Sequence, residues 1–248
     1  MVLRLCFSAL IFLYGGLALA EPMPRWVTLS RLLTLDSEKL PRSTVISRLR
    51  KIDDLEAKVK LGLKSPDYRY YALDIISALE LKDFIEPLQS SVLVDVDGYN
   101  ILTLNTLLDK KSVKPIAEAY RKHIETNIST LSPGAIVALI DSLARWGTPM
   151  TKQSVESLLA HNYTEVRLSV LDYLRSMILV YRKKNYLNFL PKLMDMQPFQ
   201  VRLKSLYLFD DLPGGSARGK LLGNCFKDKN ALVRLQCRRF QEKWSKSL

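Results

Sequence analysis

Acidic side chains recur along the chain at positions that could support acid–base chemistry or hold a cation. Six segments of the chain have a similar pattern, and we take residues 69, 100, 136, 167, 202 and 234 as their starting positions. The fifth residue after each starting position is in turn Asp74, Asn105, Asp141, Asp172, Tyr207 and Arg239. Carboxylates act as general acids or bases when they converge and their pKa values are perturbed. The sequence favours a second, structural role, with Asp141 pairing with Arg167 and Asp172 with Arg202, because a guanidinium fork can bridge carboxylates between neighbouring helices.

The two histidines, His123 and His161, are weak candidates for catalysis or metal binding. Neither lies in a nucleophile elbow or a zinc motif. The glycine-containing segment 213–220 lacks the strand and the spacing of a phosphate-binding loop and is predicted to be a loop. We therefore expect no catalytic residue, no cofactor and no metal, and predict that the chain is not an enzyme.

The positive charge of the chain is concentrated near its C-terminus. Residues 175–248 hold 16 Lys and Arg against 5 Asp and Glu, whereas residues 21–174 hold 20 of each. A one-sided positive field favours anionic partners. The binding candidates are basic residues with an interleaved tryptophan: Arg175, Lys204, Arg238, Arg239, Lys243 and Trp244. The alternative is a solvated capping helix whose aromatic residues pack on the preceding helix.

The N-terminal segment and the cysteines indicate the cellular compartment in which the protein is expected. Residues 1–20 combine a short basic start, an apolar run and Ala18-Leu19-Ala20, which predicts a signal peptide cut after Ala20 and a periplasmic or secreted protein. An uncleaved membrane anchor is the alternative, and no span is expected in the mature chain. Cys225 and Cys237, twelve residues apart, could form a disulfide in an oxidising compartment or remain two buried thiols.

The elements that would position these residues are helices. Apolar residues follow five of the six starting positions by one, four and seven residues, which gives those helices a broad apolar surface. From residue 234 the fourth and seventh following residues are instead Arg238 and Gln241. A second helical segment precedes several of these starts, across residues 111–125, 152–161, 186–196 and 217–228. The pattern predicts helical hairpins joined by short polar turns, with starts 31 to 36 residues apart.

These hairpins resemble HEAT-like repeats of the short type first noted around phycobilisome lyases. The resemblance is carried by a polar turn followed by Val166-Arg167, Val201-Arg202 and Val233-Arg234. It implies an all-α, right-handed α-solenoid of about six hairpins over residues 55–248, with residues 21–54 as an N-terminal cap or a divergent first hairpin.

The same resemblance implies a function. It points to a non-enzymatic scaffold that binds a protein partner through a concave surface. The alternative is binding of an anionic envelope polymer, lipid head groups or nucleic acid through the basic C-terminal repeats, nucleic acid being disfavoured if the protein is exported. A third reading is an enzyme, because some HEAT-like proteins act as lyases or DNA glycosylases.

Overall fold

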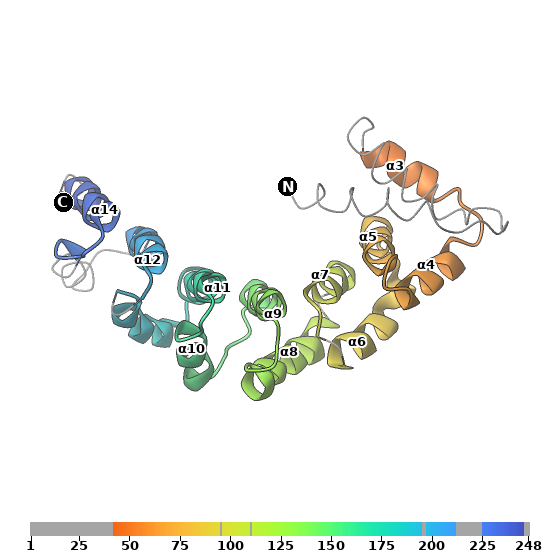
Figure 1. Cartoon of the computed structure of the whole chain (residues 1–248), viewed down its shortest axis with the longest axis horizontal. Coiled ribbons are helices and arrows are strands. Elements are labelled where there is room, and N and C mark those ends of the chain that lie inside the picture. Colours follow the sequence, from red (N-terminus) through yellow and green to blue (C-terminus); the bar gives the residue numbers. More distant parts are fainter. Residues whose placement is uncertain (1–41, 95, 110, 195–196, 212–224, 246–248) are drawn as a thin grey trace, which may run out of the picture. The chain divides into compact units, whose positions relative to one another are not determined.

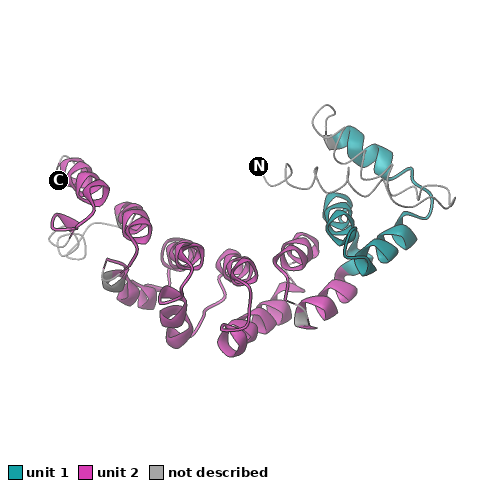
Figure 2. Cartoon of the chain, in the orientation of Figure 1, with its two compact units in different colours: residues 1–84 teal, residues 85–248 magenta. Residues whose placement is uncertain are grey.

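The computed structural model describes residues 42–94, 96–109, 111–194, 197–211 and 225–245, and no strand occurs among them. The predicted all-helical class is confirmed for these residues. The chain divides into two compact units, Met1–Phe84 and Ile85–Leu248 (Figure 2). The predicted signal peptide, residues 21–41 of the predicted cap and residues 213–220 lie outside the described residues.

The first unit is built from short helices around the buried face of α5. Its elements are α3 (Arg42–Leu49), α4 (Leu55–Lys64), α5 (Arg69–Leu79) and the 3-10 helix η3 (Lys82–Phe84). Helix α4 packs against α5. On α5, Leu73, Ile76 and Leu79 are buried at the spacing of one helix face. Helix α5 begins at Arg69, the first starting position of the repeat.

The second unit is a succession of helices joined by short turns. It contains α6 (Ile85–Val94), α7 (Gly98–Leu107), α8 (Val113–Asn127), α9 (Pro133–Trp146), α10 (Lys152–Leu159), α11 (Thr164–Arg175), the π-helical turn η4 (Ser176–Val180), the 3-10 helix η5 (Lys184–Leu193), α12 (Phe199–Asp211) and α14 (Ala231–Ser245). The predicted helix over residues 186–196 is thus a 3-10 helix that ends at Leu193. No helix among the described residues is long and apolar enough to cross a membrane.

The helices of the second unit lie in two layers (Figure 1). In one layer α7, α9, α11, α12 and α14 pack each against the next, and we call this layer the inner row. In the other layer α6, α8, α10 and η5 pack against α7, α9, α11 and α12 respectively. Each pair is a helical hairpin. The inner row brings side chains from positions more than 30 residues apart onto one surface.

Helix α9 shows why the apolar pattern is so broad. Its neighbours are α7, α8 and α11, so it is covered on three sides. Ile136, Leu139, Ile140 and Leu143 are consequently all fully buried. The helix begins with Ser132, whose hydroxyl accepts a hydrogen bond from the Ala135 N–H at 3.2 Å, an ordinary N-cap.

Helix α9 is capped at its C-terminal end by a glycine. Gly147 has φ 66°, in the left-handed region. A Cβ atom there would lie 2.3 Å from the ring of Tyr181, whose hydroxyl donates to the Arg145 carbonyl. By contrast, a Cβ atom on Gly134 in the first turn of α9 would have nothing within 4 Å.

We expect Gly147→Ala to lower the free energy of unfolding by about 2 to 4 kcal/mol, because it adds left-handed strain and displaces the Tyr181 ring. Gly134→Ala is the matched control and should be neutral or stabilising by up to ~1 kcal/mol, since alanine favours the helix. Urea denaturation followed by circular dichroism measures both. Equal effects of the two substitutions would contradict the packing of Tyr181 on Gly147.

Candidate binding surface between α11 and α12

The arginines near the start of three inner-row helices make the same contact with their own turns. The guanidinium group of Arg167 donates to the main-chain carbonyl of His161, and that of Arg202 to the carbonyl of Gln197. Arg234 donates through Nη1 to the carbonyl of Asp228 at 2.6 Å. Each arginine therefore ties the turn that precedes its helix to the helix itself. The Val-Arg pairs of the sequence mark these positions.

Two of these arginines also reach forward to the next turn. Arg167 donates through Nη1 to the side-chain oxygen of Gln197 at 3.2 Å. Arg202 forms a bidentate pair with Asp228, with Nε–Oδ2 at 2.6 Å and Nη2–Oδ1 at 2.9 Å. Gln197 and Asp228 thus occupy equivalent positions. The main-chain carbonyl of each accepts a hydrogen bond from the arginine of the helix that follows it, and the side chain of each accepts from the arginine of the helix before it. This contact joins successive hairpins.

The predicted ladder of Asp141 with Arg167 and Asp172 with Arg202 is wrong in its partners. Asp141 accepts a hydrogen bond from Ser169 Oγ at 2.8 Å, and Asp172 pairs with Lys204 Nζ at 2.6 Å. Side chains on a helix lean toward its N-terminus, so an arginine near the helix start points into the turns and away from carboxylates further along the preceding helix.

Sequence reasoning missed Gln197 and Asp228 as the partners of these arginines. The available signal was a side-chain acceptor five or six residues before an arginine, in the turn. That spacing predicts the contact only once the direction of the arginine side chain is known. Asp141 and Asp172 instead contact residues that lie two positions after the predicted arginines. Asp141 contacts Ser169, two residues after Arg167, and Asp172 contacts Lys204, two residues after Arg202.

The Arg202–Asp228 pair is buried and charged. The two side chains are only 10% and 6% exposed. Burial alone would raise the pKa of Asp228. The hydrogen bonds from Arg202 and from the Asn230 N–H, with the charges of Arg202 and Arg234, outweigh burial and hold that pKa below its ordinary value. The hydrogen bond to Asp228 raises the pKa of Arg202. Both groups therefore stay ionised.

A groove open to solvent lies between α11 and α12. One cavity in it, of about 250 Å³, is lined by Leu171, Asp172, Arg175, Lys204, Tyr207, Leu208, Asp210 and Asp211. A second cavity of about 480 Å³ shares Asp172 and Arg175 and extends to Ser176, Leu179 and Val180. We call the two together the α11–α12 groove. It brings together the predicted binding residues Arg175 and Lys204, whereas Arg238 and Arg239 lie on α14 outside its lining.

Charges in and beside this groove are paired between helices. Arg175 pairs with Asp211 at 2.8 Å across α11 and α12, and Lys204 pairs with Asp172. Lys243 of α14 pairs with Asp210 of α12 at 2.6 Å. Most of these side chains are at least a third exposed, and exposed ion pairs contribute only about 0–1 kcal/mol each. The groove is therefore polar, nearly neutral and easily rearranged.

Trp244 is a packing residue in this structure. It is 9% exposed, and its indole N–H donates to Asp210 Oδ1 at 2.9 Å. Its ring stacks on Phe240, whose ring meets Tyr207 edge-on. The aromatic residues of α14 thus pack on α12, as the capping-helix alternative predicted. Trp244 offers no open face to a ligand.

Two of the three cysteines form a disulfide. Cys225 and Cys237 are bonded, with Cα atoms 6.1 Å apart, and both are fully buried. The disulfide attaches the segment that carries Asp228 to α14. This pairing corresponds to the first of the two alternatives for these cysteines.

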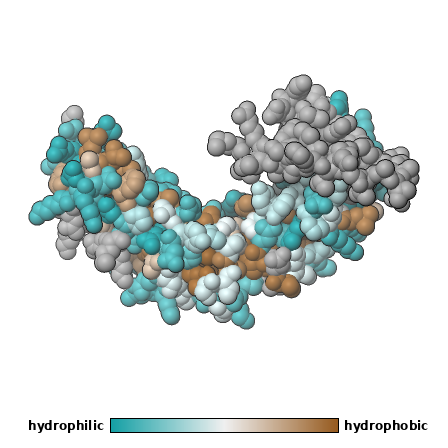
Figure 3. All heavy atoms as spheres, viewed as in Figure 1, coloured by the Kyte–Doolittle hydropathy of each residue, from teal (hydrophilic) through white to brown (hydrophobic). Residues whose placement is uncertain are grey.

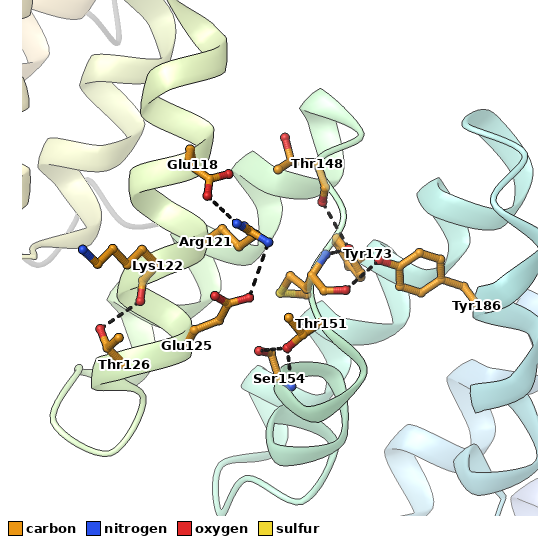
Figure 4. A network of polar contacts seen from close by, with 11 residues as sticks. Glu118, Arg121, Lys122, Glu125, Thr126, Thr148, Thr151, Ser154, Tyr173 and Tyr186 are labelled. Atoms are coloured by element: carbon orange, nitrogen blue, oxygen red, sulfur yellow. Dashed lines mark hydrogen bonds and ion pairs between the residues drawn. The ribbon is translucent and has the colours of Figure 1, made fainter.

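Two buried tyrosines hold the turn between α9 and α10 (Figure 4). The Tyr173 hydroxyl oxygen accepts from the Met150 N–H at 2.7 Å, and the Tyr186 hydroxyl donates to the Met150 carbonyl at 3.0 Å. The two hydroxyls lie 2.9 Å apart. Burial raises the pKa of both phenols, so they remain neutral hydrogen-bonding groups. Their role is to fix the turn.

The other titratable candidates do not converge. Burial raises the pKa of Asp74 and of Asp141, the latter aided by the charge of Asp172 and opposed by the Ser169 hydrogen bond. Asp172 lines the groove, whereas Asp141 lines neither of its cavities. His161 accepts through Nδ1 from the Tyr163 N–H at 3.3 Å within its own turn.

His123 and the acidic side chains also fail to form a metal site. His123 lies near Asn127 on α8, and burial with the charge of Lys122 lowers its pKa. Within the described ranges, no group of three or more His, Cys, Asp or Glu side chains could hold a metal ion.

Comparison with known proteins adds no family. No family model matches the chain, and neither curated proteins nor solved structures give a match. The resemblance to HEAT-like repeats therefore rests on the residues of this chain.

We expect Arg202→Met to lower the free energy of unfolding by roughly 3–5 kcal/mol, because it leaves the Asp228 carboxylate buried without its partner. Lys204→Met, two residues on, removes an exposed pair and should cost less than about 1 kcal/mol. Chemical denaturation of the two variants measures the difference. A similar loss in both would show that the buried pair has no special weight.

The same pair gives the unfolding free energy a pH dependence. The folded-state pKa of Asp228 lies below its ordinary value of 3.8, so its contribution is complete above that value and is lost as the pH falls through the lower folded value. Asp228→Asn should remove this acid-sensitive component. The idea fails if that variant keeps the wild-type decline below pH 3.8.

Proposed function

We propose that the chain is a HEAT-like α-solenoid that acts as a non-enzymatic scaffold and binds a protein partner on the exposed face of its inner row. Two features support the solenoid. The helices of the second unit pack as successive hairpins, and equivalent arginine-to-turn contacts recur at Arg167 and Arg202. The resemblance in the sequence assigns this architecture to interaction surfaces, which is a warrant from fold rather than from chemistry.

The observation that carries the proposal is the α11–α12 groove. Its ion pairs are exposed, so a partner can exchange its own charged groups for them at small cost. Tyr207 is 52% exposed beside them, and a tyrosine in such a place is a common energetic centre of protein interfaces. Val180, at the end of the second cavity, adds exposed apolar surface. Polar and apolar elements together fit a protein segment.

An enzyme is the less favoured function for this groove. Catalytic sites and small-molecule sites are usually concave, largely apolar pockets with convergent titratable groups. The groove is open, and its charged groups are neutralised by one another. This arrangement suits recognition of an extended surface better than activation of a reacting group.

We expect a photo-crosslinking amino acid in place of Tyr207 to capture one defined protein in the cells that make this chain. The same amino acid in place of Lys122, an exposed residue of α8 outside the inner row, is the control and should not capture that protein. Mass spectrometry of the crosslinked products identifies the partner. Arg175→Ala combined with Lys204→Ala should weaken capture without unfolding the protein.

Two outcomes would count against the scaffold. Capture of the same protein from Tyr207 and Lys122 alike would show collision rather than a site. Retention of capture in the Arg175→Ala and Lys204→Ala variant would remove the groove from the interface. Binding should also survive moderate salt, because Tyr207 and Val180 would contribute apolar contacts that salt does not screen.

We propose further that the scaffold works outside the cytoplasm. The support is the N-terminal pattern of residues 1–20 with the disulfide between Cys225 and Cys237, because disulfides persist in oxidising compartments. The partner is then an exported or envelope protein.

We expect the N-terminus of the purified protein to be Glu21, as determined by mass spectrometry of its N-terminal peptide. Arginine at both Ala18 and Ala20 should block cleavage, because the cleavage site needs small residues, and should leave a chain longer by 20 residues. Recovery of intact wild-type chain from the cytosol, with both cysteines reduced, would overturn the proposal.

A further inference from the structure

The outer surface of α14 carries exposed leucines on a helix that has already buried its apolar face. Val233, Cys237 and Phe240 are buried at helical spacing, and α14 packs through this side against α12. Leu232 and Leu235 remain 55% and 47% exposed. Figure 3 shows apolar and hydrophilic surface side by side over α14. Exposed leucines on a surface helix call for an explanation when packing within the unit does not use them.

Positive charge surrounds these leucines. Residues 225–245 contain six Lys and Arg and two Asp and Glu. Arg238 and Arg239 are exposed and form no ion pair with another described residue. Leu232, Leu235 and Arg239 are spaced by three and four residues, so they share one side of the helix, with Arg238 beside it. We call these four residues the α14 outer face.

We propose that the α14 outer face docks on an anionic lipid surface. The arginines would bind lipid phosphates, and the leucines would enter the boundary between head groups and acyl chains. The exposed residues Lys227 and Lys229, in the turn before α14, add to the attraction. Charge complementarity alone would fit any polyanion. A soluble polyanion offers nothing to Leu232 and Leu235, whereas a lipid interface accepts both kinds of side chain.

This docking differs in kind from the scaffold function and does not depend on it. The α11–α12 groove has paired charges, and the α14 outer face has arginines without acidic partners among the described residues. A peripheral helix can therefore hold the chain at a membrane surface while the inner row binds its partner. Membrane attachment would be reversible and sensitive to salt.

Sedimentation with large unilamellar vesicles tests the proposal, using the protein purified in the form that cells produce. We expect binding to vesicles with 30 mol% phosphatidylglycerol and much weaker binding to pure phosphatidylcholine. Arg238→Gln with Arg239→Gln should weaken partitioning about 25-fold, that is about fivefold for each charge. Leu232→Ser with Leu235→Ser should weaken it about tenfold. Lys114→Gln with Lys122→Gln, on exposed residues of α8, is the charge-matched control and should change it less than twofold.

Each outcome decides for or against the membrane surface. Equal loss in the α8 control and the α14 arginine variant would reduce the effect to net charge and overturn the proposal. Unchanged partitioning of the leucine variant, with equal binding to soluble polyphosphate, would assign the face to a soluble polyanion instead. Absence of binding to the anionic vesicles would also overturn it. All substitutions are at exposed positions, and circular dichroism verifies the fold of each variant.

Discussion

The second unit depends on an arginine that is bonded to two turns at once. In its buried position the guanidinium of Arg202 donates to the Gln197 carbonyl and holds the Asp228 carboxylate in a fork. One planar cation thereby fixes the entry into its own helix and the position of the next turn. Because the pair is buried, loss of either partner would leave an uncompensated charge and lower the free energy of unfolding.

Helix packing adds a second constraint along the whole unit. Successive inner-row helices contact one another, and α9 is covered on three sides. Its apolar residues therefore extend around most of its circumference. The exposed strip that remains carries the carboxylates and cations that pair from one helix to the next, as Asp172 does with Lys204. The same packing that makes the core also places polar groups on a continuous surface.

Much of this fold could be predicted from the sequence, and the reason is periodicity. Five of the six starting positions of the repeat lie two to three residues inside an observed helix, and Arg69 is itself a first residue. The side-chain partners could not be predicted in the same way. Asp141 and Arg167 have residue types and a spacing that suit an ion pair. The side chain of Arg167, however, points toward the next turn, where it donates to Gln197. The 3-10 form of η5 and the burial of Trp244 likewise depend on tertiary contacts.

The positive charge near the C-terminus separates in space into two surfaces of different character. At the α11–α12 groove Arg175, Lys204 and Lys243 are each neutralised by an aspartate of a neighbouring helix. Their charges no longer steer a distant anion, and what they offer a partner is shape and exchangeable hydrogen bonds. Part of the excess remains on α14, where Arg238 and Arg239 lie beside exposed leucines. A field of this kind acts at a distance of about one Debye length, roughly 8 Å at physiological salt. Compensated charge therefore favours specificity at the groove, and uncompensated charge favours attraction to an extended anionic surface at α14.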